Sequence, residues 1–353
     1  MSNYQTLSIL GNGSSSIQKN NLPQSNKKAF SFHCKVSGTG KILEKEENTP
    51  FGKAVYQYSY DRKGHLTEVM RNGKIIERYE YSPEGQRVED YRASFGGGRQ
   101  FIYGHDGTLI RVNDAYLDWT PKGQLKAIYS QNERIEYEYG NDTRLDKVFL
   151  SSGDVIQYEY ANELMPVRVL AGYEPVLEYS WKNHVQLDRC VDIQNDVTYI
   201  FAYGAGRVPE YVTIQGQPHA IQRITGQFAT SLKLRIWTDQ IGSIRALSRD
   251  TGTVIKYLEY DAFGNITLDT KSEWSFPLGF AGGLNDFYNG FVRFGFRDYD
   301  PQVGRFTAKD PIGDTGGDHD LWDYWVDDPV SFNDPSGLVP FPLLAAALGV
   351  LGG

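Results

Sequence analysis

The sequence predicts an all-β protein built as one continuous, curved sheet of hairpins. Three observations lead to this prediction. Aromatic residues are abundant, with 24 Tyr, 18 Phe and 6 Trp in 353 residues; short alternating runs end in an aromatic residue; and polar turns, many of them containing Gly, follow these runs. The unit recurs about every 20 residues, a period typical of stacked repeat architectures. Because one hairpin cannot bury its aromatic face alone, neighbouring hairpins are expected to pair edge to edge.

The individual hairpins follow from alternation along the chain. In residues 135–139 (IEYEY) the apolar and acidic side chains alternate, which places them on opposite faces of a strand. The fixed period over about 150 residues favours a continuous sheet over separate β-meanders. We expect helix to be confined to short turns within residues 280–330. The repeat tyrosines are expected to occupy equivalent sites facing the inside of the sheet: Tyr60, Tyr81, Tyr139 and Tyr160.

The composition excludes several classes of partner and cofactor. The net charge of -8 and the pI near 5.4 argue against nucleic acid and anionic membrane surfaces. No stretch of about 18 apolar residues is present, so no membrane-spanning helix is expected. Two cysteines are too few for a disulfide framework, and the six histidines lack metal-ligand spacing. We expect no metal and no cofactor, and a solvated loop rather than a calcium site at the acidic cluster of Asp314, Asp318, Asp320 and Asp323.

The two ends of the chain differ in character. The N-terminus has neither the basic region nor the apolar region of a secretory signal. Residues 11–28 are polar and free of aromatic side chains, so we expect a flexible leader or a segment that orders only against a partner. Residues 339–353 are apolar, uncharged and too short to cross a bilayer. We expect this tail to lie inside the fold or to have lost what followed it.

Four Asp-Pro dipeptides lie close together near the C-terminal end, at Asp300, Asp310, Asp328 and Asp334. A residue before proline is pushed out of the helical region, and Asp can bond its own downstream backbone. Each dipeptide therefore predicts a turn, and the segment must fold back on itself several times. Such folding brings carboxylates that are distant in sequence close together in space. On the residues alone, Asp-Pro pairs are more often turns than catalytic groups.

Two parts of the chain resemble the Rhs and YD-repeat family. Residues 58–66 (YSYDRKGHL) look like a YD repeat, and residues 257–266 (YLEYDAFGNI) look like the transition into the Rhs repeat-associated core domain. The stretch from RDYDP at residue 297 through GRF to DPIG at residue 313 follows the core pattern closely. DPSGL at residues 334–338 matches the terminal motif of that domain. The similarity extends from about residue 50 to residue 338.

The resemblance implies a spiral β-sheet that forms part of a hollow shell and is closed by an Rhs core domain. We therefore expect a flexible leader at residues 1–50, a YD-repeat sheet at 51–270, the core and autoprotease region at 271–338, and an apolar tail at 339–353. Shells of this family enclose a variable C-terminal polypeptide, often a toxin. Because such proteins are much longer than this chain, we expect a few turns of the spiral here.

The resemblance also implies partners and a location. Proteins of this family are made in the bacterial cytoplasm without a signal peptide and exported by a contractile system, such as type VI secretion, or as part of a toxin complex. They are extracellular after delivery. The expected partners are the C-terminal toxin or cargo segment, the delivery machinery and an immunity protein for the cargo.

The resemblance assigns roles to residues of the core region. Asp310 and Asp334 match the aspartyl pair of the family, and Arg297 matches a functionally required position. Two carboxylates a hydrogen bond apart share one proton, so the ionised member can take a proton from water while the protonated member donates one. We expect a single hydrolysis of the bond between Leu338 and Val339, and not a turnover enzyme.

Two departures from the family pattern stand in this region. One additional residue near 318–320 separates the last two matching Asp-Pro motifs, and Asp327 and Asp328 stand where Asn-Asn is usual. Two alternatives remain open. The first is a non-cleaving YD-repeat module that binds a protein or a glycan through aromatic ridges. The second is a hydrolase with paired carboxylates that acts on an external substrate, such as a glycosidase.

Overall fold

The computed structural model describes residues 29–140, 142–161, 164–313, 320–324, 327–338 and 341–342. These residues form a 22-stranded antiparallel sheet, a four-stranded sheet and a two-stranded sheet. The long sheet consists of β1 (Ser31–Val36), β2 (Ile42–Thr49), β3 (Gly52–Tyr60), β4 (Leu66–Arg71), β5 (Lys74–Tyr81), β6 (Arg87–Arg92), β7 (Gly97–Tyr103), β8 (Leu109–Val112), β9 (Ala115–Trp119), β10 (Leu125–Tyr129), β11 (Arg134–Tyr139), β12 (Leu145–Phe149), β13 (Val155–Glu159), β14 (Arg168–Ala171), β15 (Glu174–Trp181), β16 (Leu187–Asp192), β17 (Val197–Ala202), β18 (Tyr211–Gly216), β19 (Ser231–Thr238), β20 (Ile244–Ser248), β21 (Val254–Tyr260) and β22 (Ile266–Asp269).

The remaining elements are short. The four-stranded sheet contains β23 (Leu284–Asn285), β24 (Val292–Phe294), β25 (Arg297–Asp300) and β26 (Arg305–Phe306). The two-stranded sheet contains β27 (Phe332–Asn333) and β28 (Phe341–Pro342). Helical structure in the described residues comprises α1 (Pro218–Thr225) and the 3-10 turns η1 (Ala93–Phe95) and η2 (Phe280–Gly282).

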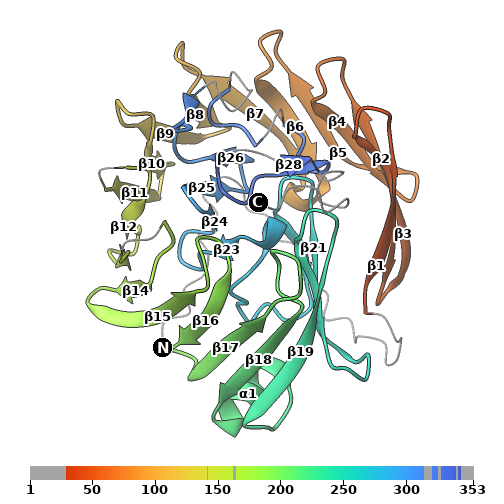
Figure 1. The fold of residues 1–353 in the computed structure, drawn as a ribbon. Helices are drawn as coiled ribbons and strands as arrows, with labels where there is room; N and C mark the ends of the chain where they lie inside the picture. The colour runs from red at the N-terminus through yellow and green to blue at the C-terminus, as the bar shows by residue number, and fades with distance from the viewer. Residues whose placement is uncertain are drawn as a thin grey trace.

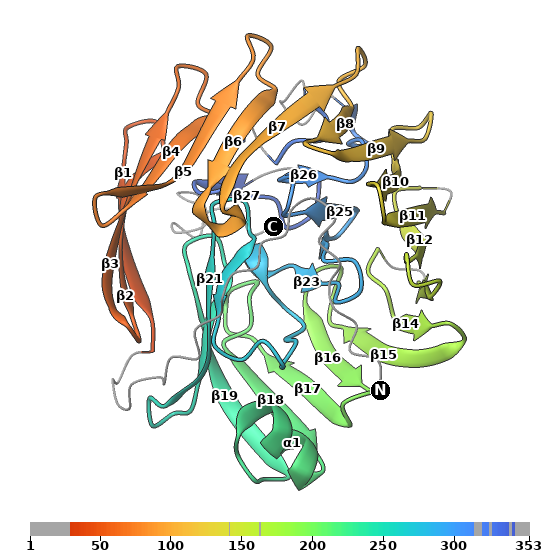
Figure 2. The same cartoon turned by 180° about the vertical axis from the view of Figure 1, so that it is seen from behind.

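The long sheet follows the chain without a crossover. From β1 to β22, each strand pairs antiparallel with the next strand in sequence. The sheet curls round, so its strands surround the segment that carries β23 to β26 (Figures 1 and 2). The predicted all-β fold with one continuous sheet of hairpins is therefore confirmed.

Many hairpin turns share one construction, which the turn after β3 illustrates. The Asp61 N–H donates to the His65 carbonyl at 3.0 Å, and the Gly64 N–H donates to the Asp61 carbonyl at 3.2 Å. Gly64 has a φ of 98°, a left-handed conformation that L side chains rarely adopt. The pairing register shifts at the last residue of the strand, which marks a β-bulge. Such shifts occur at Tyr60, Tyr81, Tyr103, Tyr139, Trp181 and Tyr260.

The aromatic residue at the end of a hairpin strand bonds to the preceding hairpin. The Tyr81 hydroxyl donates to the carbonyl of Leu66 at 2.8 Å, and Leu66 is the residue that pairs with Tyr60 across the preceding bulge. We call this aromatic-to-carbonyl hydrogen bond a rung. Rungs recur along the sheet from Tyr60 to Ile42, Tyr103 to Arg87, Trp119 to Leu109, Tyr160 to Leu145, Trp181 to Pro166 and Tyr203 to Leu187.

Tyr139 departs from this pattern. Its hydroxyl is buried, bonds to no carbonyl among the residues that the structure describes, and lies near Thr307 of the C-terminal region. The preceding hairpin would supply its acceptor at Leu125. The N–H of that residue donates to the Thr307 carbonyl at 2.7 Å. The C-terminal region thus docks at this hairpin, as it also does at Leu66, which keeps its rung and donates its N–H to the Asp327 carbonyl at 3.2 Å. The buried Tyr260 hydroxyl likewise bonds to no carbonyl of the described residues.

The repeat tyrosines face the inside of the curl, as the alternation predicts. Tyr60, Tyr81 and Tyr139 are half-buried and pack against the hydrophobic core. Tyr160 lines a small cavity on the same side, together with Asp298 of the C-terminal region. The predicted orientation of these four side chains is confirmed.

The C-terminal region fills the inside of the curl. Phe291 stacks on Tyr137 with ring centroids 5.3 Å apart, and the Trp274 Nε1–H donates to the Tyr199 hydroxyl at 2.9 Å. Two cavities lined by this region and the sheet have volumes of about 20 and 40 Å³, enough for water molecules but not for a polypeptide. In the described part of the chain, the core region therefore packs against the concave face of the sheet.

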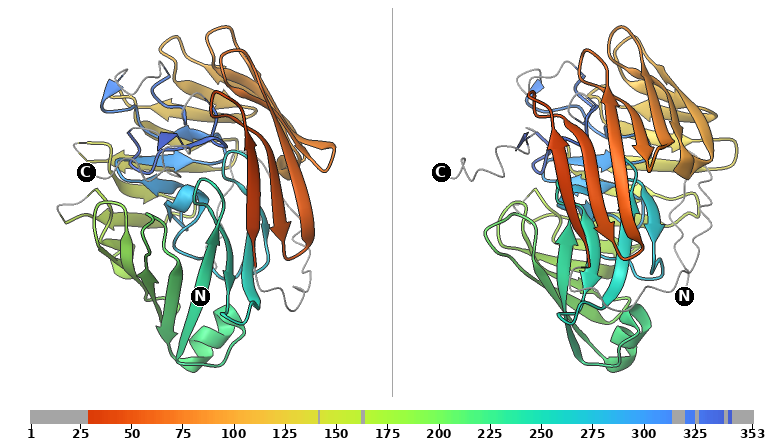
Figure 3. Two further views of the ribbon diagram at one scale, coloured as in Figure 1. Left: turned by 45° about the vertical axis from the view of Figure 1, so that its right-hand side comes forward. Right: turned by 90° about the vertical axis from the view of Figure 1, so that its right-hand side faces the viewer.

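The first and last strands of the sheet lie side by side (Figure 3). Arg245 on β20 contacts both carboxylate oxygens of Glu47 on β2, at 2.7 and 3.0 Å. Arg71 on β4 contacts both carboxylate oxygens of Glu259 on β21, at 3.0 and 2.9 Å. No backbone pairing joins these two ends within the described ranges. Side-chain ion pairs therefore hold the curl together where the backbone ladder does not close.

The start of the sheet corrects one expected boundary. β1 and β2 lie within residues 1–50, which we expected to form a flexible leader. The physical reason is burial, because Phe30 packs with Tyr257 in a hydrophobic cluster and anchors the chain just before β1. The polar residues 1–28 lie outside the described residues.

Helix α1 corrects a second expectation, because it lies outside residues 280–330. Pro218 occupies its first turn, where a missing N–H costs nothing. Gly226 ends it with a φ of 75°, and Ile221 and Ile224 are buried on one face. The sequence contains these helix signals, the proline at the start and the glycine at the end. They lie between two strands, in a region whose pattern predicts β-structure. No helix among the described residues has both the length and the apolar character needed to cross a membrane.

Tyr81→Phe tests the rung. The substitution keeps the ring but leaves the Leu66 carbonyl without this donor, so we expect the free energy of unfolding to fall by about 1–2 kcal/mol. Urea denaturation followed by circular dichroism measures the change. Tyr139→Phe is the matched control and should cost clearly less, because its hydroxyl bonds to no carbonyl of the described chain. Equal losses at both positions would contradict a stabilising role for the rung.

Candidate functional site

Arg297 is the centre of the candidate site. It begins β25, and its side chain is buried with the guanidinium 3.7 Å from the centroid of the Phe306 ring. Its Nε–H donates to the Gly337 carbonyl at 2.5 Å, and one Nη–H donates to the Leu321 carbonyl at 3.1 Å. A guanidinium held on an aromatic face by two carbonyls has little freedom to move.

The two carboxylates that the sequence singles out meet on this guanidinium. One terminal nitrogen of Arg297 lies 2.8 Å from the Asp310 carboxylate and 3.5 Å from the Asp334 carboxylate. Burial lowers the pKa of Arg297, while Asp310, Asp334 and Asp323 raise it. The structure therefore brings together all three residues for which a catalytic role was expected.

Asp310 is fixed by its own backbone and by the turn that contains Leu321. Its N–H donates to the Leu321 carbonyl at 2.9 Å, and its carboxylate accepts the Ile312 N–H at 2.9 Å. Burial raises the pKa of Asp310, although Arg297 acts in the opposite direction. An Asp with a raised pKa keeps its proton to a higher pH than a free one, which suits a proton donor.

Asp334 orders the backbone that leads to the expected cleavage point. One carboxylate oxygen accepts the Ser336 hydroxyl at 3.0 Å and the Leu338 N–H at 3.1 Å. Its own N–H donates to the Tyr324 hydroxyl at 3.0 Å. Leu338 is half-buried, and Val339 lies outside the described residues. Asp334 therefore both faces the guanidinium and holds the turn before the expected scissile bond.

The terminal turn packs tightly against the chain next to Arg297. The Phe296 N–H donates to the Ser336 carbonyl at 2.9 Å. A Cβ atom at Gly295 would lie 2.4 Å from the Ser336 carbonyl oxygen, and one at Gly337 would lie 2.4 Å from the Phe294 carbonyl oxygen. Both glycines also have positive φ, at 45° and 70°. Side chains at these two positions would push the terminal turn away from the site.

Three residues of the site were missed by the sequence analysis. Asp323 was grouped with the acidic loop, yet it acts electrostatically on Arg297. Tyr324 and Phe306 are buried in one aromatic cluster, with rings stacked at 5.8 Å. The quoted GRF motif contains Phe306, but nothing in its spacing shows that its ring lies under a guanidinium.

The additional residue between the two Asp-Pro motifs does not prevent Asp310 and Asp334 from meeting. It falls near residues 318–320, and residues 314–319 lie outside the described residues. The chain is anchored again at Asp320, whose carboxylate pairs with Arg305 at 2.6 and 2.7 Å. In the described ranges no group of three His, Cys, Asp or Glu side chains is arranged to hold a metal ion.

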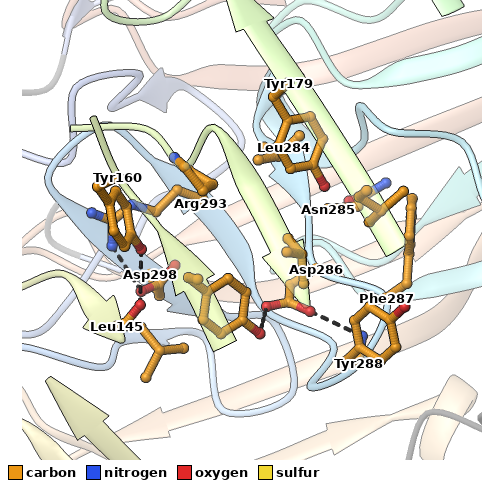
Figure 4. Close-up of a pocket in the computed structure, with 14 residues that line it drawn as sticks. Leu145, Tyr160, Tyr179, Leu284, Asn285, Asp286, Phe287, Tyr288, Arg293 and Asp298 are labelled. Atoms are coloured by element: carbon orange, nitrogen blue, oxygen red, sulfur yellow. Dashed lines mark hydrogen bonds and ion pairs between the residues drawn. The ribbon is translucent and has the colours of Figure 1, made fainter. Parts of the chain in front are cut away.

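A second acidic cluster joins the sheet to the core region (Figure 4). Asp286 accepts the Tyr158 hydroxyl of β13 and the Tyr288 N–H, the latter at 2.9 Å. Burial raises the pKa of Asp286 to about 6. Nearby, Arg293 pairs with Asp298 at 2.8 Å. The cavity between them is about 20 Å³, so the cluster is a structural contact rather than a substrate pocket.

The continuous curled sheet of YD-type hairpins, packed around the C-terminal region, has the architecture of a YD-repeat shell protein. The Teneurin YD-shell family model matches residues 2–185 and 226–320 of this sequence. The chain belongs to this family, and the predicted Rhs and YD-repeat relationship is confirmed.

Individual relatives match parts of the chain. Teneurin-4 of Homo sapiens is 32% identical over 127 residues, which are 36% of this chain and 4% of that protein. Double-stranded DNA deaminase toxin A of Burkholderia cenocepacia (strain H111) is 35% identical over 105 residues, 29% of this chain and 7% of that protein. This chain therefore spans a small fraction of each of these two proteins.

A solved structure shares the fold. The crystal structure of TcdB2-TccC3-TEV has a TM-score of 0.50 and 15% sequence identity, and the similarity covers 88% of this chain and 18% of that chain. At this identity the likeness concerns the fold, and it agrees with the curled sheet described above. The chain corresponds to a short part of that much longer structure.

The raised pKa of Asp286 predicts a pH-dependent contribution to stability. Its folded-state pKa of about 6 lies above the ordinary value of 3.8, so the folded chain binds more protons than the unfolded chain between these values. The free energy of unfolding should therefore fall as the pH rises through this window, and stay lower above it. Asp286→Asn should remove this part of the slope in urea unfolding measured across the window.

Asp154→Asn serves as the control for this experiment, because Asp154 is exposed at a hairpin turn. It should leave the pH dependence of the parent protein unchanged. A slope in Asp286→Asn equal to that of the parent protein would show that Asp286 does not contribute to it.

Proposed function

We propose that this chain is the core-bearing end of an Rhs-type YD-repeat shell, and that it hydrolyses its own Leu338–Val339 bond once. One observation supports this most directly. The Arg297 guanidinium contacts Asp310 and Asp334, and it also donates to the carbonyl of the residue just before Leu338. Arg297 therefore contacts both the proposed acid–base pair and the residue before the expected cleavage point.

The proposed reaction uses one proton held by the acidic pair. Two carboxylates and one guanidinium carry a net negative charge, which a single proton neutralises. Asp310, with its raised pKa, holds this proton. Asp334 takes a proton from water as the water oxygen adds to the Leu338 carbonyl carbon. Asp310 then protonates the Val339 nitrogen as the C–N bond breaks, and Arg297 keeps both acids in position.

Asp323 is a second candidate for the base. It acts electrostatically on Arg297, as Asp310 and Asp334 do. One oxygen of Asp334 is already engaged by Ser336 and Leu338, which leaves the other to act on water. Separate substitutions of Asp323 and Asp334 distinguish these two assignments.

The enclosed polypeptide and the delivery route are part of the proposal. The core region occupies the concave face in the described residues, so a chamber for a C-terminal toxin or cargo segment needs more sheet than these 22 strands. Similarity to a DNA deaminase toxin and to a TcdB2-TccC3 structure supports a bacterial toxin context. We infer synthesis in the cytoplasm, export by a contractile secretion system or a toxin complex, and an immunity protein for the cargo.

Mass spectrometry under denaturing conditions tests the cut. The parent protein should yield a chain that ends at Leu338 in place of the intact 39.9 kDa species. Asp310→Asn should slow the cut by about 10²–10⁴-fold, the usual contribution of a general acid or base. Arg297→Lys should also slow it, because a lysine keeps the charge but loses the planar fork.

The remaining variants complete this test. Of Asp323→Asn and Asp334→Asn, the one that removes the base should match Asp310→Asn. Asp154→Asn, at an exposed turn, should cut at the parent rate. An intact chain as the sole product of the parent protein would contradict self-cleavage and favour a non-cleaving interaction module.

A further inference from the structure

The segment that leads into Asp310 is paired with a hairpin turn of the sheet. The Leu125 N–H donates to the Thr307 carbonyl at 2.7 Å, and the Lys309 N–H donates to the Gly123 carbonyl at 3.0 Å. Between these two bonds, residue 124 lies opposite residue 308 in an antiparallel bridge. The backbone immediately before Asp310 therefore takes its position from the turn between β9 and β10.

The chain that follows the acidic loop is fixed to the same turn. The Trp322 Nε1–H donates to the Gly123 carbonyl at 2.9 Å, and the Trp322 ring meets the Trp119 ring edge to face at 5.9 Å. Next to Trp322 is Leu321, whose carbonyl accepts the N–H of Asp310 at 2.9 Å. The residue before Asp310 is thus bonded to this hairpin, and the acceptor of the Asp310 N–H lies next to a residue that is bonded to the same hairpin.

Gly123 leaves no room for a side chain. A Cβ atom there would lie 2.9 Å from the Trp322 ring and 3.1 Å from the Lys309 Cβ. Gly153 closes a turn with the same pair of backbone hydrogen bonds and a similar φ, 91° against 77°, yet it has nothing within 4 Å. The crowding at Gly123 therefore comes from the docked core segment and not from the turn itself.

The next hairpin along the sheet holds the other half of the site. The Thr143 hydroxyl, in the turn between β11 and β12, donates to the carbonyl of Phe296, the residue before Arg297. Between these two turns stands Tyr139, whose hydroxyl lies near Thr307 instead of making a rung. Two consecutive hairpins thus contact the chain segments that lead into Asp310 and Arg297.

We propose that these two hairpin turns, through residues 120–124 and through Thr143, position Asp310 and Arg297 for the cut, and that Gly123 is a positioning residue. Because the turns come from the sheet, the acid and the guanidinium meet after the sheet has curled around the core region. Cleavage therefore requires the folded sheet. This inference rests on the proposed self-cleavage and adds its regulation.

Gly123→Asn tests the positioning role, with Gly153→Asn as the matched control. Asn tolerates the left-handed conformation, so both variants keep their turns and differ in what the new side chain meets. We expect Gly123→Asn to slow cleavage by about 100-fold, the effect of a displacement near 1 Å. Gly153→Asn should cleave at the parent rate. Cleavage of Gly123→Asn at the parent rate would overturn the proposal.

A second measurement separates this inference from the proposed function. In the uncleaved Asp310→Asn background, hydrogen exchange of the peptide that contains Lys309 should be faster with Gly123→Asn and unchanged with Gly153→Asn. Unchanged exchange with Gly123→Asn would refute the docking role whatever the cleavage result. An uncleaved parent protein with this exchange difference would refute the cleavage and leave the docking role in place.

The variant Trp322→Phe separates a loss of positioning from a general loss of folding. It keeps an aromatic ring on the turn and removes the N–H that bonds to Gly123. We expect slower cleavage together with a melting temperature close to that of the parent protein. Parent-rate cleavage by a folded Trp322→Phe would count against the positioning role of this turn.

Discussion

The fold depends on one repeated interaction, the rung from a strand-end aromatic residue to a carbonyl of the preceding hairpin. Backbone pairing alone lets neighbouring hairpins slip in register, and a slip of one residue would turn the aromatic face outwards. A rung such as Tyr81 to Leu66 fixes that register, because the ring must be buried and its hydroxyl must reach one particular carbonyl. Repetition of this contact keeps one face of the sheet apolar and inward throughout the curl.

The same geometry explains how the sheet receives the core region. The bulge at each strand end frees the N–H of the residue that begins the return strand, and a buried free N–H needs an acceptor. Core segments supply acceptors at several of these positions. The bonds run from Ile42 to the Ser331 hydroxyl, from Leu66 to Asp327, from Leu125 to Thr307 and from Ile244 to Gly279. Docking of the core is therefore a consequence of how each repeat ends.

The balance of charge differs between the contact of the first and last strands of the sheet and the candidate site. Where β2 meets β20, the buried cations Lys45 and Arg245 face the buried carboxylates of Glu47 and Asp239, so the charges balance. At the candidate site, Arg297 faces more than one carboxylate, and the excess negative charge favours retention of a proton. The first arrangement stabilises a contact, whereas the second leaves a titratable group at a fixed position.

The sequence by itself determined the hairpin sheet, the inward tyrosines and the membership of Arg297, Asp310 and Asp334 in one site. These features depend on alternation, on glycine turns and on motifs whose effects are local or shared by a family. The tertiary structure alone decided that the core fills the curl and that Asp323 joins the site. It also decided that Gly123 carries the segment before Asp310. These contacts join parts of the chain that are far apart in sequence, and their distances depend on how tightly the sheet curls, which no local pattern encodes.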